Sequence, residues 1–253
     1  MRKFLGVAIL AAFVIGPVQY AFAAAEQEQI QKEITSMTLQ ELEKAGDARR
    51  AIQDYPGAII FFQEYIRRDN RNELVHNKLG LSHMLRGDNH AARRAFERAV
   101  RLKSNYANAL NNLGVVHFRE NRTTRAERYF RRAIAAEETR AAFYVNLGVA
   151  LFNQNKIELA MREYARAIAL DPEVLWRSSS LGITAQISNK YDSGRFYFVL
   201  ARVMAYLGAL EDCLRCLELA NESGYRGLRE VYRDDVFKAL WDDVRLHEIL
   251  APS

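Results

Sequence analysis

Cysteine is scarce in this sequence: only Cys213 and Cys216 occur among its 253 residues. They form one Cys-x-x-Cys motif, and a zinc site would need a second pair of ligands, which the chain lacks. Haem attachment would need a histidine directly after the motif, where Leu217 stands. Two uses of the pair remain, burial as small apolar side chains or a labile disulfide, and we favour burial.

Catalytic signatures are absent as well. The chain has no Walker loop, no Gly-x-Ser-x-Gly elbow and no His-Glu-x-x-His motif. Its paired carboxylates, Glu137-Glu138 and Asp242-Asp243, are adjacent in sequence, so on a helix they would point in different directions. The sequence therefore predicts a protein that is not an enzyme and that uses no cofactor and no metal.

Proline is rare, with four residues, and the most apolar stretch lies at the N-terminus. Met1-Arg2-Lys3 precedes an apolar stretch over residues 4–16, and Ala21-Phe22-Ala23 follows it. A charged start, an apolar middle and an Ala-x-Ala exit are the parts of a secretory signal peptide. The stretch is shorter than the roughly 20 apolar residues that span a bilayer. We expect cleavage after Ala23, with Ala25 as the alternative, and an exported protein, periplasmic or secreted, without a stable membrane anchor.

The net charge of the sequence is small, at +5, but the charged residues are unevenly distributed along the chain. Residues 86–140 hold 13 basic and 6 acidic side chains, whereas residues 211–248 hold 6 basic and 10 acidic ones. Most such charges belong to solvated helix faces. A second interpretation is steering of an acidic partner or docking near an anionic membrane surface. The modest excess argues against nucleic-acid binding.

What the sequence does have is a period of 34 residues. Glycine, alanine and a large aromatic residue each keep this spacing four times, at Gly46, Gly80, Gly114 and Gly148, at Ala58, Ala92, Ala126 and Ala160, and at Phe62, Phe96, Phe130 and Tyr164. A period of this length is typical of stacked helical hairpins. The small residues suit points where two helices approach closely, and spacings of three and four place the large residues on one buried stripe.

The clearest copies lie between residues 76 and 172. One of them reads Leu110-x-x-Leu113-Gly114-x-x-His117, followed by Ala126-x-x-x-Phe130 and Ala133. This pattern resembles the tetratricopeptide repeat. The resemblance implies an all-α fold, a right-handed α-solenoid of about five helical hairpins with a C-terminal capping helix, and a role in binding proteins.

The repeat frame divides the chain into six parts. They are a signal peptide (1–23), a lead-in segment (24–38), four repeats (39–174), an insertion (175–193), a fifth repeat (194–227) and a C-terminal cap (228–253). The insertion is inferred because the repeat positions of the fourth repeat recur in the fifth repeat 53 residues later, and not 34. A solenoid needs a cap for solubility, and we expect Leu240, Trp241, Val244 and Leu246 to cover the open end of the last hairpin.

Three histidines and Cys213 fall on packing positions of this frame. His76, His83 and His117 stand where the family packs large side chains, which implies core or boundary histidines. No carboxylate or cysteine accompanies them at ligand spacing. Cys213 stands where the other repeats have alanine, which is the reason for preferring its burial.

In this family the first helix of each hairpin lines a concave groove. Carried over position by position, the resemblance implies a mostly apolar peptide-binding groove with amides along it, formed by Asn77, Lys78, Leu81, Met84, Asn111, Asn112, Val115, Phe118, Asn146, Val149 and Phe152. An amide donates and accepts, so spaced asparagines can pair with the backbone of an extended peptide. The alternative is that the asparagines solvate a helix face and fix the packing of the hairpins.

These features together predict an exported scaffold that holds an extended segment of an envelope or secretion-machinery protein in its groove. One alternative is self-association, with Phe118 and Phe152 buried against another copy. The other is a thiol-redox protein that uses Cys213 and Cys216, and blocking the thiols would abolish function only in that case.

Overall fold

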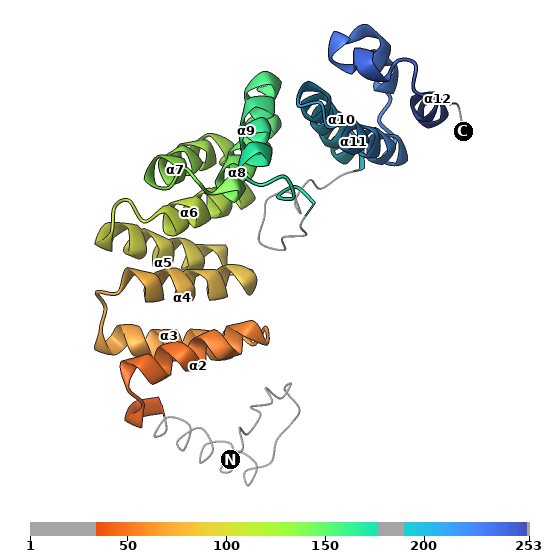
Figure 1. Ribbon diagram of the computed structural model, residues 1–253. Helices are drawn as coiled ribbons and strands as arrows, with labels where there is room; N and C mark the ends of the chain where they lie inside the picture. The colour runs from red at the N-terminus through yellow and green to blue at the C-terminus, as the bar shows by residue number, and fades with distance from the viewer. Residues whose placement is uncertain (1–33, 177–189, 252–253) are drawn as a thin grey trace.

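The computed structural model of the chain describes residues 34–176 and 190–251 (Figure 1). The predicted signal peptide, most of the lead-in segment and most of the 175–193 insertion lie outside these residues. The described parts consist of α-helices, two 3₁₀-helices and their connections, and they contain no strand. The predicted all-α class is therefore confirmed. No described helix has both the length and the apolarity that crossing a membrane requires.

Ten of the helices form five antiparallel hairpins that stack in chain order (Figure 1). The pairs are α2 (Leu39–Ala51) with α3 (Tyr55–Arg68), α4 (Glu73–Leu85) with α5 (Asn89–Leu102), α6 (Ala107–Arg119) with α7 (Thr123–Ala136), α8 (Ala141–Asn153) with α9 (Ile157–Leu170), and α10 (Lys190–Tyr206) with α11 (Leu210–Glu222). The helix α10 begins at Lys190, so the last four residues of the predicted insertion are helical. This stacking is the predicted α-solenoid.

The turn inside each hairpin repeats one backbone conformation. Gln53, Gly87, Asn121, Asn155 and Gly208 each have a positive φ, between 58° and 90°. This left-handed conformation ends a helix, and glycine and asparagine adopt it at the least cost. The first four of these residues are 34 apart, so the period of the sequence is also the period of the turns.

The repeated glycine and aromatic residue meet inside each hairpin. A Cβ atom at Gly114 would lie only 2.3 Å from a ring carbon of Phe130, and the other three glycines of the series face their aromatic partners at 2.4–2.5 Å. The aromatic rings are fully buried. A ring on the second helix therefore fills the space that the missing side chain leaves on the first, and this contact brings the two helices together.

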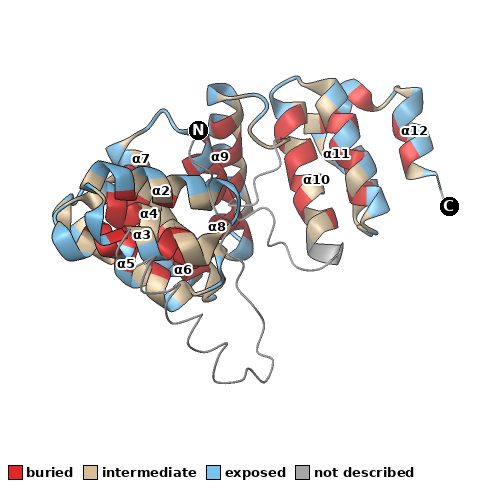
Figure 2. Cartoon of the chain, turned by 90° about the horizontal axis from the view of Figure 1, so that it is seen from below, coloured by how far each residue is buried: buried red, intermediate tan, exposed pale blue. Residues whose placement is uncertain are grey.

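First and second helices occupy different sides of the stack. The first helix α4 contacts both α2 and α6, and α6 also contacts α8. The second helices pack mainly against the first helices on either side of them. Buried residues recur as red patches between tan and pale blue ones along the helices (Figure 2). First helices that touch their successors form the inner side of a solenoid, so the second helices form its outer side.

The core continues across the gap between the fourth and fifth hairpins. The ring of Phe196 on α10 makes edge contacts with Phe152 and with Tyr164, each with ring centroids 5.8 Å apart. The helix α10 also packs against α9. The fifth hairpin therefore joins the same apolar core as the third and fourth.

The C-terminal segment packs on the last hairpin as a cap made of η2 (Leu228–Arg233), η3 (Asp235–Leu240) and α12 (Val244–Leu250). Leu240 and Leu246 are buried, as expected. Trp241 is half-buried, and its Nε1 donates to the carbonyl of Val231 at 3.0 Å. The expectation for Val244 is wrong: this first residue of α12 is 68% exposed. Phe237, fully buried with its ring centroid 5.8 Å from that of Phe198, covers the hairpin instead.

Replacing Tyr164 with phenylalanine should stabilise the protein. The Tyr164 hydroxyl is buried and has no hydrogen-bond partner, and the three preceding repeats have phenylalanine at this position. Leaving such a group unpaired costs about 1–3 kcal/mol, so its removal should raise the melting temperature by a few degrees. Circular dichroism during heating measures the change.

The matched control is Tyr144→Phe. The Tyr144 hydroxyl donates to the carbonyl of Glu138 at 3.0 Å, so its loss should cost about 1 kcal/mol. Equal shifts in the two variants would show that the Tyr164 hydroxyl is paired in solution.

Candidate peptide-binding surface

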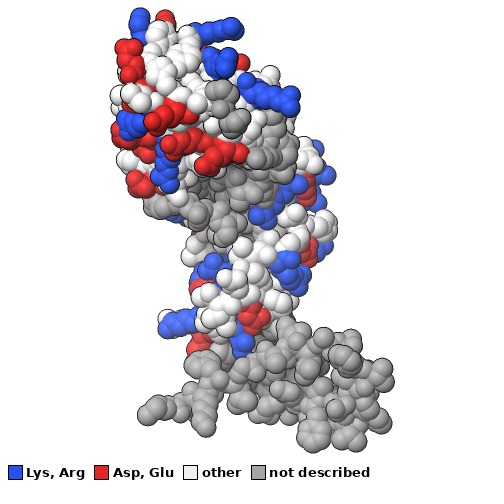
Figure 3. Space-filling view, turned by 90° about the vertical axis from the view of Figure 1, so that its right-hand side faces the viewer, with Lys and Arg blue, Asp and Glu red and all other residues white. Residues whose placement is uncertain are grey.

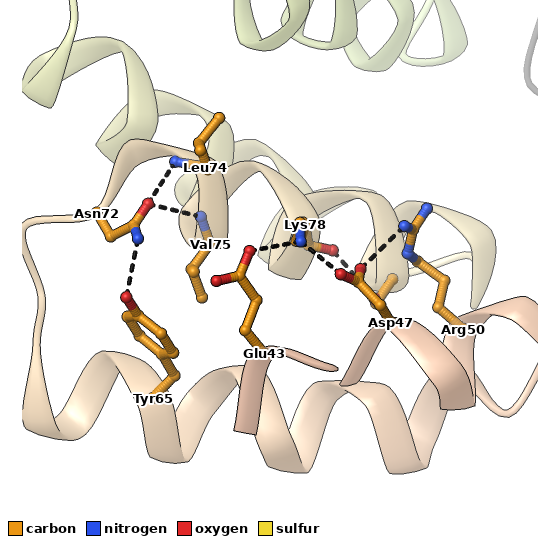
Figure 4. A network of polar contacts seen from close by, with 9 residues as sticks. Glu43, Asp47, Arg50, Tyr65, Asn72, Leu74, Val75 and Lys78 are labelled. Atoms are coloured by element: carbon orange, nitrogen blue, oxygen red, sulfur yellow. Dashed lines mark hydrogen bonds and ion pairs between the residues drawn. The ribbon is translucent and has the colours of Figure 1, made fainter. Parts of the chain in front are cut away.

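Three polar contacts join successive first helices along the inner side of the solenoid. Nζ of Lys78 on α4 donates to the carboxylates of Glu43 and Asp47 on α2, at 2.6 and 2.5 Å (Figure 4). One hairpin further on, Nδ2 of Asn112 donates to Oδ1 of Asn77 at 3.0 Å. We call this series, with its third member described next, the polar ladder.

The third contact repeats the second. Nδ2 of Asn146 on α8 donates to Oδ1 of Asn111 on α6 at 2.9 Å. In the Glu43–Lys78 contact and in both asparagine pairs, the donor stands 35 residues after its acceptor. The ladder stops at α8. The next acceptor and donor positions hold Val145 on α8 and Val199 on α10, and both are apolar and buried. The asparagines therefore fix the packing of one hairpin on the next, as the alternative interpretation of the sequence proposed.

The ladder begins on a helix that is firmly positioned. Oδ1 of Asn72 accepts hydrogen bonds from the backbone N–H groups of Leu74 and Val75, at 3.0 and 3.3 Å, and so caps α4 (Figure 4). Its Nδ2 donates to the hydroxyl of Tyr65 on α3 at 2.8 Å. These bonds hold the start of α4 against the preceding hairpin, and Lys78 follows one and a half turns later.

The structure divides the eleven predicted groove residues into two groups. Four are partly exposed on α4 and α6, namely Lys78, Leu81, Asn111 and Asn112. The other seven are buried, namely Asn77, Met84, Val115, Phe118, Asn146, Val149 and Phe152. The expectation of an open apolar channel along all three hairpins is therefore wrong for the second group. Those side chains belong to the core, and the accessible surface is polar and lies on α4 and α6.

The two phenylalanines expected at a contact between copies are buried within one copy. Phe118 and Phe152 are only 8% and 6% exposed. Phe152 meets the ring of Phe196, and the guanidinium of Arg195 lies 5.5 Å from its centroid. Self-association through these two rings has no surface to use, and that expectation is wrong.

The histidines lie in packing positions, as expected. His76, His83 and His117 are buried, and burial lowers the pKa of each below its usual value. The His117 ring stacks on Tyr129 with centroids 5.2 Å apart. Across the described residues, no group of three or more histidine, cysteine or acidic side chains is arranged to hold a metal ion.

The cysteine pair is buried in the fifth hairpin. Cys213 and Cys216 are free thiols with no exposed surface. Burial raises the pKa of Cys213 to about 12 and raises that of Cys216 as well. Since the thiolate is the reactive form, this environment supports a packing role and gives no support to the thiol-redox alternative.

Sequence reasoning missed the acidic partners of Lys78. Glu43 and Asp47 on α2 neutralise the lysine that interrupts the asparagine series. The signal was present in the sequence, since Glu43 stands 35 residues before Lys78, as Asn77 does before Asn112. The ladder therefore has a charged first step and two amide steps.

Comparison with known proteins agrees with this architecture. A tetratricopeptide repeat family model matches residues 77–139 and 119–174. The crystal structure of MamA protein aligns with 85% of this chain and 98% of its own, at a TM-score of 0.53 and 20% identity. The crystal structure of YrrB is described as that of a TPR protein with an unusual peptide-binding site. It aligns with 81% of this chain and 92% of its own, at a TM-score of 0.51 and 17% identity. The structure of PilF from Pseudomonas aeruginosa aligns with 83% of this chain and 88% of its own, at a TM-score of 0.56 and 14% identity. No curated protein matches the chain.

Proposed function

Because the chain is a tetratricopeptide repeat protein, we propose that it is an exported scaffold that binds an extended segment of a partner protein. The observation that carries the proposal is the accessible part of the polar ladder on α4 and α6. The N-terminal signal pattern supports export, and an exported chain would meet partners of the envelope or of the secretion machinery. The likeness in fold to YrrB, whose structure is described as having a peptide-binding site, supports a peptide ligand.

The chemistry of the ladder suits a peptide backbone. An amide side chain has two donor hydrogens and two acceptor lone pairs, and each ladder contact uses one of them. Asn111 and Asn112 are partly exposed, so their remaining groups can pair with peptide N–H and C=O groups whatever the side chains of the peptide. Leu81, also partly exposed, offers an apolar contact on the neighbouring helix.

The spacing of the ladder also suits an extended chain. Packed helices stand about 8–10 Å apart, and an extended peptide advances about 3.3 Å per residue. Successive first helices would therefore meet about every third residue of the ligand. A peptide that runs across α4 and α6 should carry its main determinants at that interval.

Selection of binding sequences from a library of unstructured peptides tests the proposal directly. The target is the chain without residues 1–23, and calorimetry then measures the affinity of each selected peptide. We expect Leu81→Ser combined with Asn112→Ala to weaken binding at least about tenfold, since a hydrogen bond and an apolar contact are each worth about 1 kcal/mol. Helicity should stay unchanged.

The matched control is Asn105→Ala, which alters an exposed asparagine in the connection between α5 and α6. It should bind as the unaltered chain does. Peptides that bind the double variant and the control equally well would remove α4 and α6 from the binding surface. Affinity capture from envelope extract with the unaltered chain, the double variant and the control would identify the natural partner.

A further inference from the structure

The outer side of the solenoid carries a row of unpaired arginines. Arg94 on α5, Arg128 on α7 and Arg162 on α9 are 34 residues apart and exposed, and their side chains form no hydrogen bond or ion pair with any described residue. Arg101 on α5 and Arg125 on α7 are exposed and unpaired in the same way. We call these five residues the basic row. Unpaired charges repeated on successive hairpins form a surface that attracts an anionic partner.

The field of the basic row reaches the histidines beneath it. Burial is the main cause of their lowered pKa values, and the arginines add to it. Arg101 lowers the pKa of His76, and Arg125 lowers that of His117. Nearby acids act in the opposite direction, Asp69 on His76 and Glu120 on His117, so the pKa of each histidine reflects both charges.

The C-terminal end carries the opposite charge. A group of acidic side chains, with basic side chains around it, lies on the side of this end that faces the viewer in Figure 3. Glu218 and Glu222 stand one turn apart on α11, both exposed and without a basic partner among residues 34–176 and 190–251. Arg215, one turn before them, is held over the ring of Trp176 at 4.1 Å from its centroid. We call Glu218 and Glu222 the acidic end.

The basic row lies beside an exposed apolar side chain, and a second exposed apolar side chain lies near the start of α11. Val244, at the start of α12, is 68% exposed, and its neighbour Arg245 pairs with Glu211 of α11 at 2.8 Å. Leu159 on α9 is 40% exposed and lies one turn before Arg162. Charge complementarity sets orientation and association rate, and apolar contact slows dissociation, so the basic row has both elements of an interface.

The two surfaces cannot neutralise each other within one copy. Helices α5 and α7 lie in the middle of the stack and α11 at its far end (Figure 1). We propose that copies of this chain associate head to tail, with the basic row of one copy against the acidic end of the next. Because the two surfaces differ, such a contact is heterologous and leaves one free surface at each end of the assembly.

Sedimentation velocity of the full chain over a range of concentrations and salt tests this proposal. At low salt we expect a series of species that grows with concentration. At 1 M salt the screening length falls from about 10 Å to about 3 Å, and only single chains should remain.

Two variants block one surface each. Arg94→Gln with Arg128→Gln removes two of the five charges of the basic row, and Glu218→Gln with Glu222→Gln removes both charges of the acidic end. Each variant alone should stay a single chain at low salt. An equimolar mixture should form dimers and nothing larger, because each variant then supplies the one surface that the other lacks.

The matched control, Lys44→Gln with Arg71→Gln, removes two exposed positive charges from the first hairpin and the connection after it, and it should assemble like the unaltered chain. A chain that remains single at low salt overturns the proposal, as does a mixture that behaves like its separate components. Binding to phosphatidylglycerol vesicles through Arg94 and Arg128, without self-association, would assign the basic row to an anionic lipid surface instead. None of the three variants changes a residue of α4 or α6, so peptide binding is tested separately.

Discussion

Replacing Gly114 with leucine should lower the free energy of unfolding by about 1–3 kcal/mol, the usual cost of overpacking a core, and by more if Phe130 cannot move. The first added atom alone would lie 2.3 and 2.5 Å from two ring carbons of Phe130. The ring is fully buried, so it can yield only by separating α6 from α7. Urea denaturation followed by circular dichroism measures the loss.

The control introduces the same side chain where there is room. Ala142 is exposed on the first turn of α8, and Ala142→Leu should change stability by less than about 0.5 kcal/mol. A second test combines Gly114→Ala with Phe130→Ala. Phe130→Ala alone should cost about 3–5 kcal/mol, and the pair should cost less than the sum of the two single changes, because the smaller side chain removes the conflict. A Gly114→Leu variant as stable as the unaltered chain would contradict the proposed contact between glycine and ring.

The contact between Gly114 and Phe130 also explains why so much of the fold could be predicted from the sequence. It joins two residues 16 positions apart, and the turn at Asn121 lies between them. A hairpin whose main contacts are this local imposes its period directly on the sequence. The first helices of the first four hairpins begin at residues 39, 73, 107 and 141, at intervals of 34.

The candidate surface was less predictable because it depends on distant contacts. The burial of Phe152 depends partly on Phe196, which lies beyond the insertion and is not related to it by the 34-residue period. Family positions on a first helix indicate which way a side chain points but not what covers it. The polar ladder, by contrast, keeps a fixed offset of 35 residues, and a search for complementary polar residues at that offset would have found Glu43 opposite Lys78.

Val244 shows the same limit at the C-terminal end. Its apolar side chain and its place after the fifth hairpin predicted burial, yet the cap is made of two 3₁₀-helices of six residues and an α-helix of seven, too short to show a hydrophobic period. Without a period, the sequence does not indicate which apolar residues face inward. Nothing in the sequence favoured Phe237, whose ring packs against Phe198 of α10.

Phe237→Ala should therefore destabilise the C-terminal end selectively. Removing a fully buried phenylalanine side chain costs about 3–5 kcal/mol. In a stack where each hairpin contacts only its neighbours, a defect at one end loosens the adjacent units and leaves distant ones intact. We expect faster amide hydrogen exchange in α10 and α11, and unchanged exchange in α4 and α6.

The matched control for this variant is Val244→Ala in the same cap. Because Val244 is mostly exposed, its truncation should leave the exchange of α10 and α11 as it was. A Phe237→Ala variant that loses protection evenly from α2 to α11 would show that the array unfolds as one cooperative unit. One that loses none would show that the cap does not stabilise the last hairpin. Selective loss would instead establish that the solenoid is stabilised hairpin by hairpin, with Phe237 closing its C-terminal end.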